Sequence, residues 1–331
     1  MTTPTYDPGG NEPVIEVRNA TRSFTVRQRA GLLRRTTRHV RAVDGLSFEV
    51  AAGEMVGYIG PNGAGKSTTV KMLTGILVPT SGQVTVTGLT PYVDRTTLAR
   101  RIGVVFGQRT SLWWDLPLRD SLELLHRIYR VPRQRFRENL KTFTDLLDLG
   151  DLLDTPVRQL SLGQRMRGDI AAALLHDPQV VYLDEPTIGL DVVSKANLRG
   201  FLKETNATRG VTVLLTTHDL DDIQQLCSRV MVIDHGRMVF DGGLDALHRF
   251  GGARRTLVVD LTEPADPIVV PGAETVRVDG PRQWLTFPAE NSAAPIVAEV
   301  AASYALADLS LQEPDIEDVI TRIYSSTRPT S

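Results

Sequence analysis

A glycine-rich stretch near residue 60 has the residue types and the spacing that hold phosphate groups. Gly60 to Thr68, G-P-N-G-A-G-K-S-T, matches G-x-x-x-x-G-K-S/T and lies between a strand-like and a helix-like segment. The glycines let backbone N–H groups surround phosphate oxygens, and the start of the helix adds a favourable dipole. Lys66 is expected to reach the β and γ phosphates of a nucleotide, and the Ser67 hydroxyl to ligate Mg²⁺. The predicted phosphate loop comprises Gly60, Pro61, Asn62, Gly63, Ala64, Gly65, Lys66, Ser67 and Thr68.

Two adjacent carboxylates follow an apolar segment further along the chain. Val180 to Leu183 is strand-like, and Asp184 and Glu185 come directly after it. A pair of acids at a strand end is commonly a solvated cap. Beside a phosphate loop it has a second use, because a magnesium nucleotide needs a carboxylate near the metal and a group that orients water. Asp184 is therefore expected on the metal side, and Glu185 is the candidate general base.

Further polar residues stand in short motifs of the same region. Gln108 lies in F-G-Q-R-T, Asp191 in G-L-D and His218 in T-T-H-D, and the turn-like stretch L-S-L-G-Q ends at Gln164. Taken singly, each has an ordinary explanation, such as a satisfied polar residue at a strand end or a helix cap. In this order, over roughly residues 14–245, the motifs resemble those of the ATP-binding cassette (ABC) ATPases.

The resemblance implies a nucleotide, a metal and a role for each motif. ATP with Mg²⁺ would be the bound species. Gln108 would be the Q-loop glutamine, which contacts Mg²⁺ or the attacking water and senses a transmembrane partner. His218 would be the switch histidine near the γ-phosphate, and Asp191 the D-loop acid at a dimer seam.

The stretch L-S-L-G-Q matches the signature turn of that family, usually L-S-G-G-Q. The resemblance implies that Ser161, Gly163 and Gln164 contact ATP held by a second copy of the chain, so that ATP joins a two-fold homodimer. A helix starting near Gly163 would offer unpaired N–H groups to an anion. Leu162 occupies the position where glycine is usual. The alternative is a plain helix cap by Ser161.

The family commonly stacks an aromatic side chain from an early strand on the adenine ring. Phe24, in N-A-T-R-S-F, is the matching position. The alternative is that Phe24 belongs to the core.

The elements that must position these residues follow from the apolar pattern. Strands are predicted at 14–17, 46–50, 55–59, 180–183, 211–216 and 230–233, a helix at 67–77, and helices between about 113 and 153. Apolar strands that alternate with helices indicate an α/β fold with a mostly parallel sheet covered on both faces. The resemblance adds a P-loop NTPase core with an inserted helical subdomain at about 109–177.

The character of the sequence changes after Gly251-Gly252. Short strands are predicted at 256–261, 275–278, 284–287 and 307–311, with helices at 293–304 and 314–324. The expected domains are a flexible N-terminus at 1–13, an ATPase domain at 14–247 and a small α+β domain at 252–331.

The bulk composition excludes several classes. The 331 residues are 41% hydrophobic and 23% charged with net charge −2, so a fibre, a disordered chain and a protein with a global attraction for nucleic acid are not expected. One cysteine cannot form an internal disulfide, and no signal peptide is recognised at the N-terminus, which indicates an intracellular protein. The apolar runs are shorter than the roughly 20 residues that cross a bilayer.

The resemblance separates the subclasses of ABC ATPase. The chain lacks the long coiled coil of chromosome and repair proteins and the second cassette of translation-type proteins, which leaves transport. The stretch Y-I-G-P-N-G-A-G-K-S-T-T and the C-terminal stretch E-P-D-I-E-D-V resemble those of ATPases of ABC-2-type exporters. The implied partners are integral membrane permease subunits, which would hold the ATPase at the cytoplasmic face of the cell membrane. The alternatives are an importer ATPase with a regulatory C-terminal domain and a soluble non-transport regulator.

Two other segments each have more than one interpretation. The apolar stretch Leu112 to Pro117, with Trp113 and Trp114, is expected either to contact the permease or to belong to the core of the helical subdomain. The arginine-rich insert from Arg27 to Arg41 is a solvated charge run, a contact for lipid headgroups or, least in keeping with the acidic chain, a nucleic-acid contact.

Overall fold

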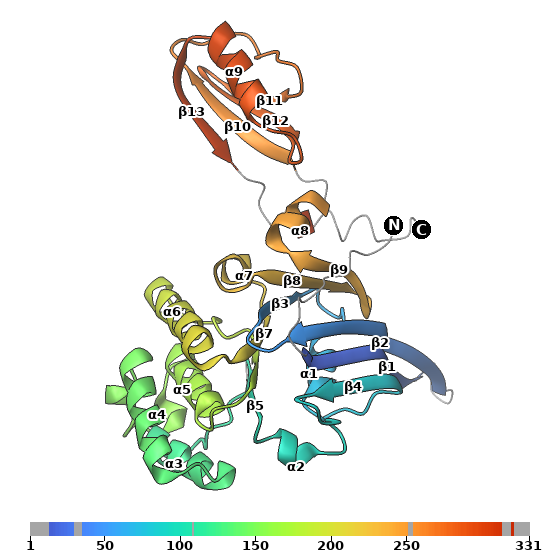
Figure 1. The fold of residues 1–331 in the computed structure, drawn as a ribbon, viewed down its shortest axis with the longest axis vertical. Helices are drawn as coiled ribbons and strands as arrows, with labels where there is room; N and C mark the ends of the chain where they lie inside the picture. Colours follow the sequence, from blue (N-terminus) through green and yellow to red (C-terminus); the bar gives the residue numbers. More distant parts are fainter. Residues whose placement is uncertain (1–12, 30–34, 108, 251–253, 313–318, 321–331) are drawn as a thin grey trace. The chain divides into compact units, whose positions relative to one another are not determined.

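The computed structural model describes residues 13–29, 35–107, 109–250, 254–312 and 319–320 (Figure 1). The chain divides into two compact units, Met1–Gly242 and Gly243–Ser331, and each is described by itself. Among the described residues, no helix is long and apolar enough to span a membrane.

A six-stranded sheet forms the centre of the first unit. Its strand order is β5-β6-β7-β3-β8-β9, and the pairs from β5 through β8 are parallel. Every residue of β3, β7 and β8 is buried, as expected for a sheet covered on both faces. The strands are β3 (Met55–Ile59), β5 (Ile102–Phe106), β6 (Val180–Asp184), β7 (Thr212–Thr216), β8 (Arg229–Asp234) and β9 (Arg237–Gly243).

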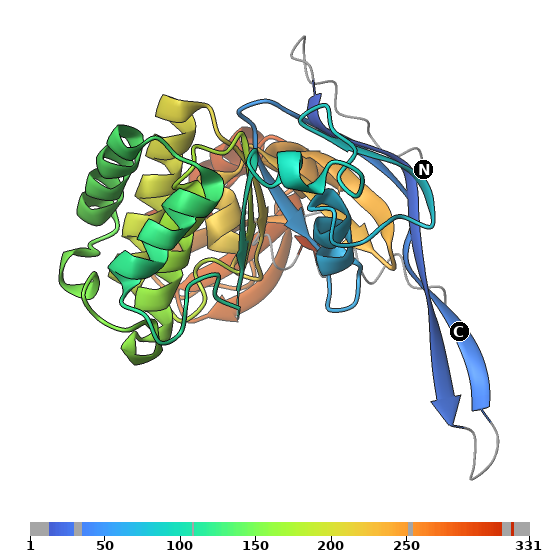
Figure 2. The same cartoon turned by 90° about the horizontal axis from the view of Figure 1, so that it is seen from below.

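A second sheet of the same unit is antiparallel, with the order β2-β1-β4. It consists of β1 (Pro13–Arg29), β2 (Arg35–Ala51) and β4 (Ser81–Val86). β4 pairs with β1 only between Ile15 and Thr21, so the rest of β1 and β2 forms a two-stranded hairpin (Figure 2). The described residues of the arginine-rich insert, 27–29 and 35–41, therefore continue two strands that were predicted to be much shorter.

Helices cover the six-stranded sheet and form the inserted subdomain. They are α1 (Lys66–Leu73), α2 (Arg95–Leu98), α3 (Leu118–Tyr129), α4 (Arg133–Leu146), α5 (Leu162–Leu174), α6 (Val192–Arg209) and α7 (Leu220–Leu226), with short 3-10 turns at Gly150–Leu152 and Val157–Gln159. Helix α1 ends earlier than predicted, because Thr74 caps it and Gly75 adopts φ +73°. The α/β fold with an inserted helical segment is confirmed.

The second unit is a small α+β fold. Helix α8 (Leu244–Phe250) precedes an antiparallel sheet of order β11-β12-β10-β13, with helix α9 (Ala294–Ser303). Alternate residues such as Leu257, Val259, Leu285 and Phe287 form one core with Ile296 and Val300 of the helix. The strands are β10 (Arg254–Leu261), β11 (Glu274–Asp279), β12 (Arg282–Pro288) and β13 (Leu306–Gln312). Of the predicted helix at 314–324, only Val319 and Ile320 are described, and both are helical and buried.

Candidate nucleotide-binding and hydrolysis site

The phosphate loop connects β3 to α1 through a backbone that only glycine permits. Gly65 has φ +109°, and a Cβ atom there would lie 2.3 Å from the carbonyl oxygen of Ala42. A Cβ atom at Gly60 would lie 2.4 Å from the carbonyl oxygen of Ile233. The loop is therefore held tightly against two neighbouring segments while its outer side faces a cavity.

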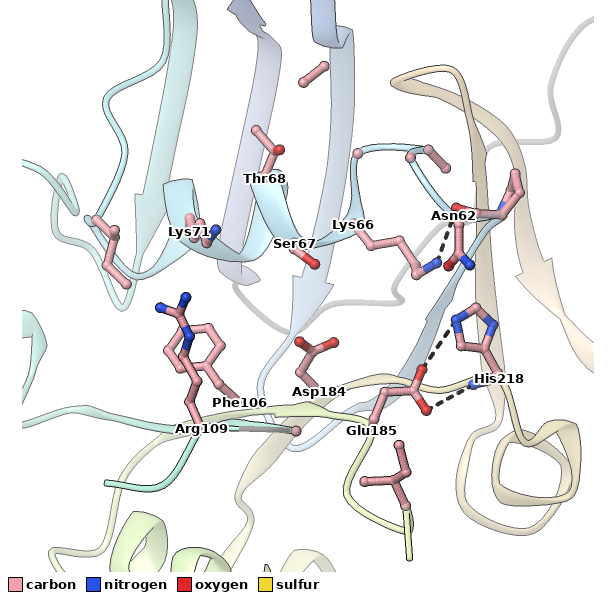
Figure 3. A pocket seen from close by; sticks show the side chains of 18 residues that line it. Asn62, Lys66, Ser67, Thr68, Lys71, Phe106, Arg109, Asp184, Glu185 and His218 are labelled. Carbon is pink, nitrogen blue, oxygen red and sulfur yellow. Dashed lines mark hydrogen bonds and ion pairs between the residues drawn. The ribbon is translucent and has the colours of Figure 1, made fainter. Parts of the chain in front are cut away.

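That cavity is the candidate nucleotide site. It has a volume of about 700 Å³ and combines the loop with the ends of two strands (Figure 3). Its size is within the range of small-molecule pockets. The lining residues are Ala42, Pro61, Asn62, Gly63, Ala64, Gly65, Lys66, Ser67, Thr68, Lys71, Ile76, Phe106, Gly107, Arg109, Asp184, Glu185, Ile188 and His218.

The Lys66 ammonium is held by carbonyl groups of its own loop. Its Nζ donates to the carbonyl oxygen of Gly60 and, at 3.3 Å, to that of Pro61. Burial lowers the pKa of Lys66 below its usual range, although the nearby carboxylates of Glu185 and Asp184 oppose this shift. The ammonium thus lies where it can exchange its contacts with carbonyl oxygens for charge-assisted hydrogen bonds to phosphate oxygens.

Asp184 is the last residue of β6 and is positioned by sheet register. Its parallel partners are Phe106 on β5 and Thr216 on β7, and the Thr216 hydroxyl donates to Asp184 Oδ1. Figure 3 shows the Asp184 carboxylate and the Ser67 hydroxyl facing one another across the pocket. Hydroxyl and carboxylate oxygens are the ligands that Mg²⁺ prefers. Among the residues that the structure describes, no cluster of three His, Cys, Asp or Glu side chains could hold a metal ion.

Glu185 and His218 face each other at the adjacent strand ends. His218 Nε2 lies 3.5 Å from Glu185 Oε1, and the His218 backbone N–H donates to Oε2 at 3.4 Å. Glu185 has φ +55°, an unusual conformation for a residue other than glycine. Burial raises the pKa of Glu185, against the opposing effects of His218 and Lys66. A carboxylate with a raised pKa and a positioned neighbour is suited to accept a proton from water.

Gln108 lies outside the described residues, so its side chain is not placed. The residues after it are anchored to the helical subdomain. The buried Asp169 carboxylate of α5 accepts hydrogen bonds from the Ser111 N–H at 2.8 Å, the Thr110 hydroxyl at 2.9 Å and the Ser111 hydroxyl at 3.0 Å. The metal and water contacts of Gln108 remain a prediction.

Phe24 does not line the pocket. It pairs with Val40 in the β1–β2 hairpin, and the Arg22 guanidinium lies 4.9 Å from the centre of its ring. Ala42, two residues after Val40, does line the pocket, so the hairpin borders the nucleotide site. Adenine stacking on Phe24 remains a prediction.

The signature turn begins helix α5. The Ser161 hydroxyl accepts from the Gln164 N–H at 3.2 Å, and the Gln164 side chain accepts from the Ser161 N–H at 2.9 Å, which forms a reciprocal capping box. Ser161 is therefore a helix cap, and its hydroxyl proton is still free to be donated to a ligand. Ser161, Gly163 and Gln164 are not among the residues that line the pocket.

The unusual Leu162 packs against the segment that leads into α6. If Gly189 carried a Cβ atom, that atom would lie only 2.5 Å from Leu162 Cδ2. A Cβ atom at Gly163 would likewise lie 2.8 Å from Leu190 Cδ2, so the two segments are in close contact. These interlocking contacts turn the leucine toward Gly189. They also join the signature turn to Asp191, which caps α6 by accepting from the Ser194 N–H at 2.9 Å.

Sequence analysis missed several pocket residues. Seven residues line the cavity although no nucleotide contact was predicted for them. They are Ala42, Lys71, Ile76, Phe106, Gly107, Arg109 and Ile188. Phe106, Gly107 and Arg109 belong to the quoted stretch F-G-Q-R-T around Gln108, so that motif could have indicated them. Ala42, Lys71, Ile76 and Ile188 belong to no quoted motif and reach the cavity only through tertiary folding.

Comparison with known proteins identifies the family of the chain. The family model described as ABC transporter matches residues 43–188. The chain is 33% identical over 294 residues to the daunorubicin resistance ATP-binding protein DrrA3 of Streptomyces coeruleorubidus, which covers 87% of this chain and 92% of that protein. It is 34% identical over 292 residues to the Nod factor export ATP-binding protein I of Rhizobium sp. (strain N33), covering 85% and 91%.

Comparison with solved structures also finds ABC ATPases. A dimeric post-hydrolysis structure of the ATP-binding cassette MJ0796 bound to ADP and Pi has 26% identity and a TM-score of 0.60, and covers 70% of this chain and 98% of that chain. An ATP binding subunit of an ABC transporter has 26% identity and a TM-score of 0.63, covering 72% and 93%.

The chain belongs to the ABC transporter family, as its motifs predicted. It is an ATP-hydrolysing subunit of the exporter class, and the exporter interpretation is thereby favoured over the importer and regulator alternatives.

Proposed function

We propose that two copies of this chain close around two ATP molecules and that this closure drives export by separate permease subunits. The observation that carries the proposal is the separation of two phosphate-binding elements. The phosphate loop lines the cavity, whereas the signature turn at Ser161 lies outside it. A single chain thus offers only half of an ATP site, and a two-fold pair supplies both halves twice.

The chemistry assigned to each side chain follows from its place in the pocket. Lys66 neutralises the β and γ phosphates, and Glu185 accepts a proton from the attacking water. The His218 contacts at 3.5 and 3.4 Å keep the Glu185 carboxylate in one orientation. Ser161 and the N–H groups that follow it donate to the γ-phosphate from the second copy, where negative charge develops during hydrolysis.

Ser67 and Asp184 are the residues proposed to hold Mg²⁺, with Gln108 as an additional contact. A bound Mg²⁺ would neutralise charge on the β and γ phosphate oxygens. The Thr216 hydroxyl keeps one oxygen of Asp184 occupied and so orients the other toward the cavity.

Closure produces mechanical work because ATP contacts both halves of the dimer and its products do not. A ligand shifts a conformational equilibrium only through its differential affinity for the two states. Phosphate release removes the γ-phosphate contact to Ser161, so the closed state loses its advantage. The permeases then follow the opening of the ATPase pair at the cytoplasmic face of the membrane.

The segment Leu112 to Pro117 is the proposed permease contact. Trp113 is 38% exposed and Trp114 is 50% exposed, which disfavours the interpretation that both belong to the core. Trp114 is stacked by the Arg165 guanidinium at 5.3 Å, and its carbonyl oxygen accepts from the Arg158 N–H at 2.9 Å. An aromatic side chain held in a half-exposed position is typical of interface anchors.

Reconstitution with the copurified permeases tests this function. ATP hydrolysis should rise when permeases are present, and Trp114→Ala should remove the stimulation while ATP affinity stays unchanged. Arg158→Ala, which loses the nearby Asp115 ion pair of 2.5 Å but keeps the indole, is the matched control. Full stimulation of the Trp114 variant would contradict the assigned contact, and a chain that recovers no membrane proteins would contradict the transport role.

A further inference from the structure

A buried carboxylate lies directly behind the two strand ends that carry Glu185 and His218. Asp222 of α7 is completely inaccessible to solvent, and it does not line the nucleotide cavity. A buried charge is costly unless it is paired and hydrogen-bonded. The partners of this carboxylate therefore indicate what it does.

One oxygen of Asp222 connects the two catalytic turns. Oδ2 accepts from the Thr187 hydroxyl at 2.6 Å and lies 3.4 Å from the Thr217 hydroxyl. Thr187 is two residues after Glu185, and Thr217 immediately precedes His218. Thr187 and Thr217 are both buried.

The other oxygen connects these turns to helix α6. Oδ1 accepts from Arg199 Nε at 2.6 Å, and Arg199 also reaches Asp219 at 3.6 Å. Lys195, one turn earlier on α6, donates to Asp219 at 2.5 Å. Although burial alone would raise the pKa of Asp219, the hydrogen bond and charge of Lys195 and the charge of Arg199 hold that pKa below its usual range. Asp219 is thus a fixed anion beside His218.

We infer that Asp222 is a positioning residue for hydrolysis, which fixes the turn of Glu185 relative to the turn of His218 and ties both to the helix that Asp191 begins. The inference rests on the proposed roles of Glu185 and His218. The 3.5 Å approach of these two side chains joins different strands, so its length depends on what holds the strand ends together from behind. Asp222 supplies that connection with a charge-assisted bond on each oxygen.

The connection to α6 gives the arrangement a second consequence. Helix α6 starts at Asp191, beside the Leu162–Gly189 contact of the signature turn. The Arg199–Asp222 contact therefore joins the helix that starts beside the signature turn to the turns of Glu185 and His218.

The test removes one hydroxyl without altering the buried charge. Thr187→Val keeps the side-chain shape but loses the donor to Asp222, whereas Thr187→Ser keeps the donor. We expect Thr187→Val to lower kcat about tenfold, since small displacements of a catalytic group have effects of this order or greater. The ATP dissociation constant should stay within about twofold, because the phosphate loop is untouched, and Thr187→Ser should restore most of kcat.

Arg199→Gln, measured in parallel, perturbs the other oxygen and should also lower kcat more than ATP affinity. A native kcat for Thr187→Val, or a Thr187→Ser variant as slow as Thr187→Val, would overturn the inference. So would loss of ATP binding in both Thr187→Val and Arg199→Gln, because that result indicates general damage to the fold. Failure of the proposed function has a different signature, namely normal hydrolysis by Glu185→Gln.

Discussion

Glu185 and His218 contact each other twice, through the imidazole at 3.5 Å and through the histidine backbone N–H at 3.4 Å. Each residue follows a different strand of the parallel sheet, with Glu185 after β6 and His218 after β7. The Glu185 N–H donates to the Thr216 carbonyl oxygen at 2.9 Å, which keeps the two strand ends in register. The sheet therefore brings the two residues together, and the hydrogen bonds of Asp222 to Thr187 and Thr217 are proposed to fix the distance between them.

Glu185→Gln should lower kcat by about 10² to 10⁴, the usual contribution of a positioned general base. The glutamine side chain has the same shape and still reaches the His218 N–H, so the affinity for ATP should be unchanged. Single-turnover hydrolysis with an independent binding titration separates the two quantities. A glutamine variant that hydrolyses ATP at the normal rate would remove Glu185 from the role of base.

The pH dependence of hydrolysis should report the raised pKa of Glu185. A carboxylate acts as a base only when ionised, and burial favours its neutral form. As pH falls, kcat at saturating ATP should therefore decline with a midpoint above 4.5, the ordinary value for a glutamate. Because the shift is upward, activity is present above the shifted pKa and is lost below it. An acid limb centred at or below 4.5 would disagree with a buried base.

Substitution of two loop glycines should separate backbone strain from steric overlap. Gly63 and Gly65 both have positive φ, at +83° and +109°, so alanine at either costs roughly 1–2 kcal/mol of backbone strain. Only at Gly65 would the new Cβ atom meet a backbone oxygen, at 2.3 Å, while that of Gly63 meets nothing within 4 Å. Gly65→Ala should abolish ATP binding, and Gly63→Ala should weaken it by no more than about thirtyfold. Equal affinities for the two variants would contradict the assigned loop geometry.

Ser161 allows a test of helix capping against phosphate contact. Ser161→Ala loses both the cap and the hydroxyl donor, and it should destabilise α5 by about 1 kcal/mol, whereas Ser161→Gly costs only a few tenths. If the hydroxyl contacts ATP of the second copy, both variants should lose ATPase activity to a similar extent despite this difference in thermal stability. Native activity for Ser161→Gly would show that capping is the sole role of the serine.

The fold and the site differ in how far the sequence predicts them. Short apolar runs that end in Gly60 or Asp184 indicated the strand ends, because strands buried on both faces of a parallel sheet are nearly continuous apolar runs. The pairing of residues 22–29 with 35–43 was missed as structure, because these two strands lack an alternating apolar pattern. Strands β4, β5 and β9 were missed as well. Each contains glycine, and β4 and β9 also carry several polar residues, so no unbroken apolar run marks them.

The motifs predicted the groups that are proposed to contact the nucleotide, but not the groups that hold those side chains in place. Asp222 stands in the sequence H-D-L-D-D-I, which is typical of a solvated helix start. Its burial depends on Arg199 and Thr187, 23 and 35 residues away. Similarly, the contact between Leu162 and Gly189 explains a departure from the usual signature turn, and no local pattern predicts it.

The most direct measurement of the shared ATP site is the mass of the Glu185→Gln protein in solution, by sedimentation velocity, with its permeases and in excess ATP and Mg²⁺. The account predicts two ATPase chains in contact with two trapped ATP molecules, and their separation when ATP is replaced by ADP or when Ser161→Gly is added. ATPase chains that stay apart at saturating ATP, with every phosphate loop occupied, would contradict it.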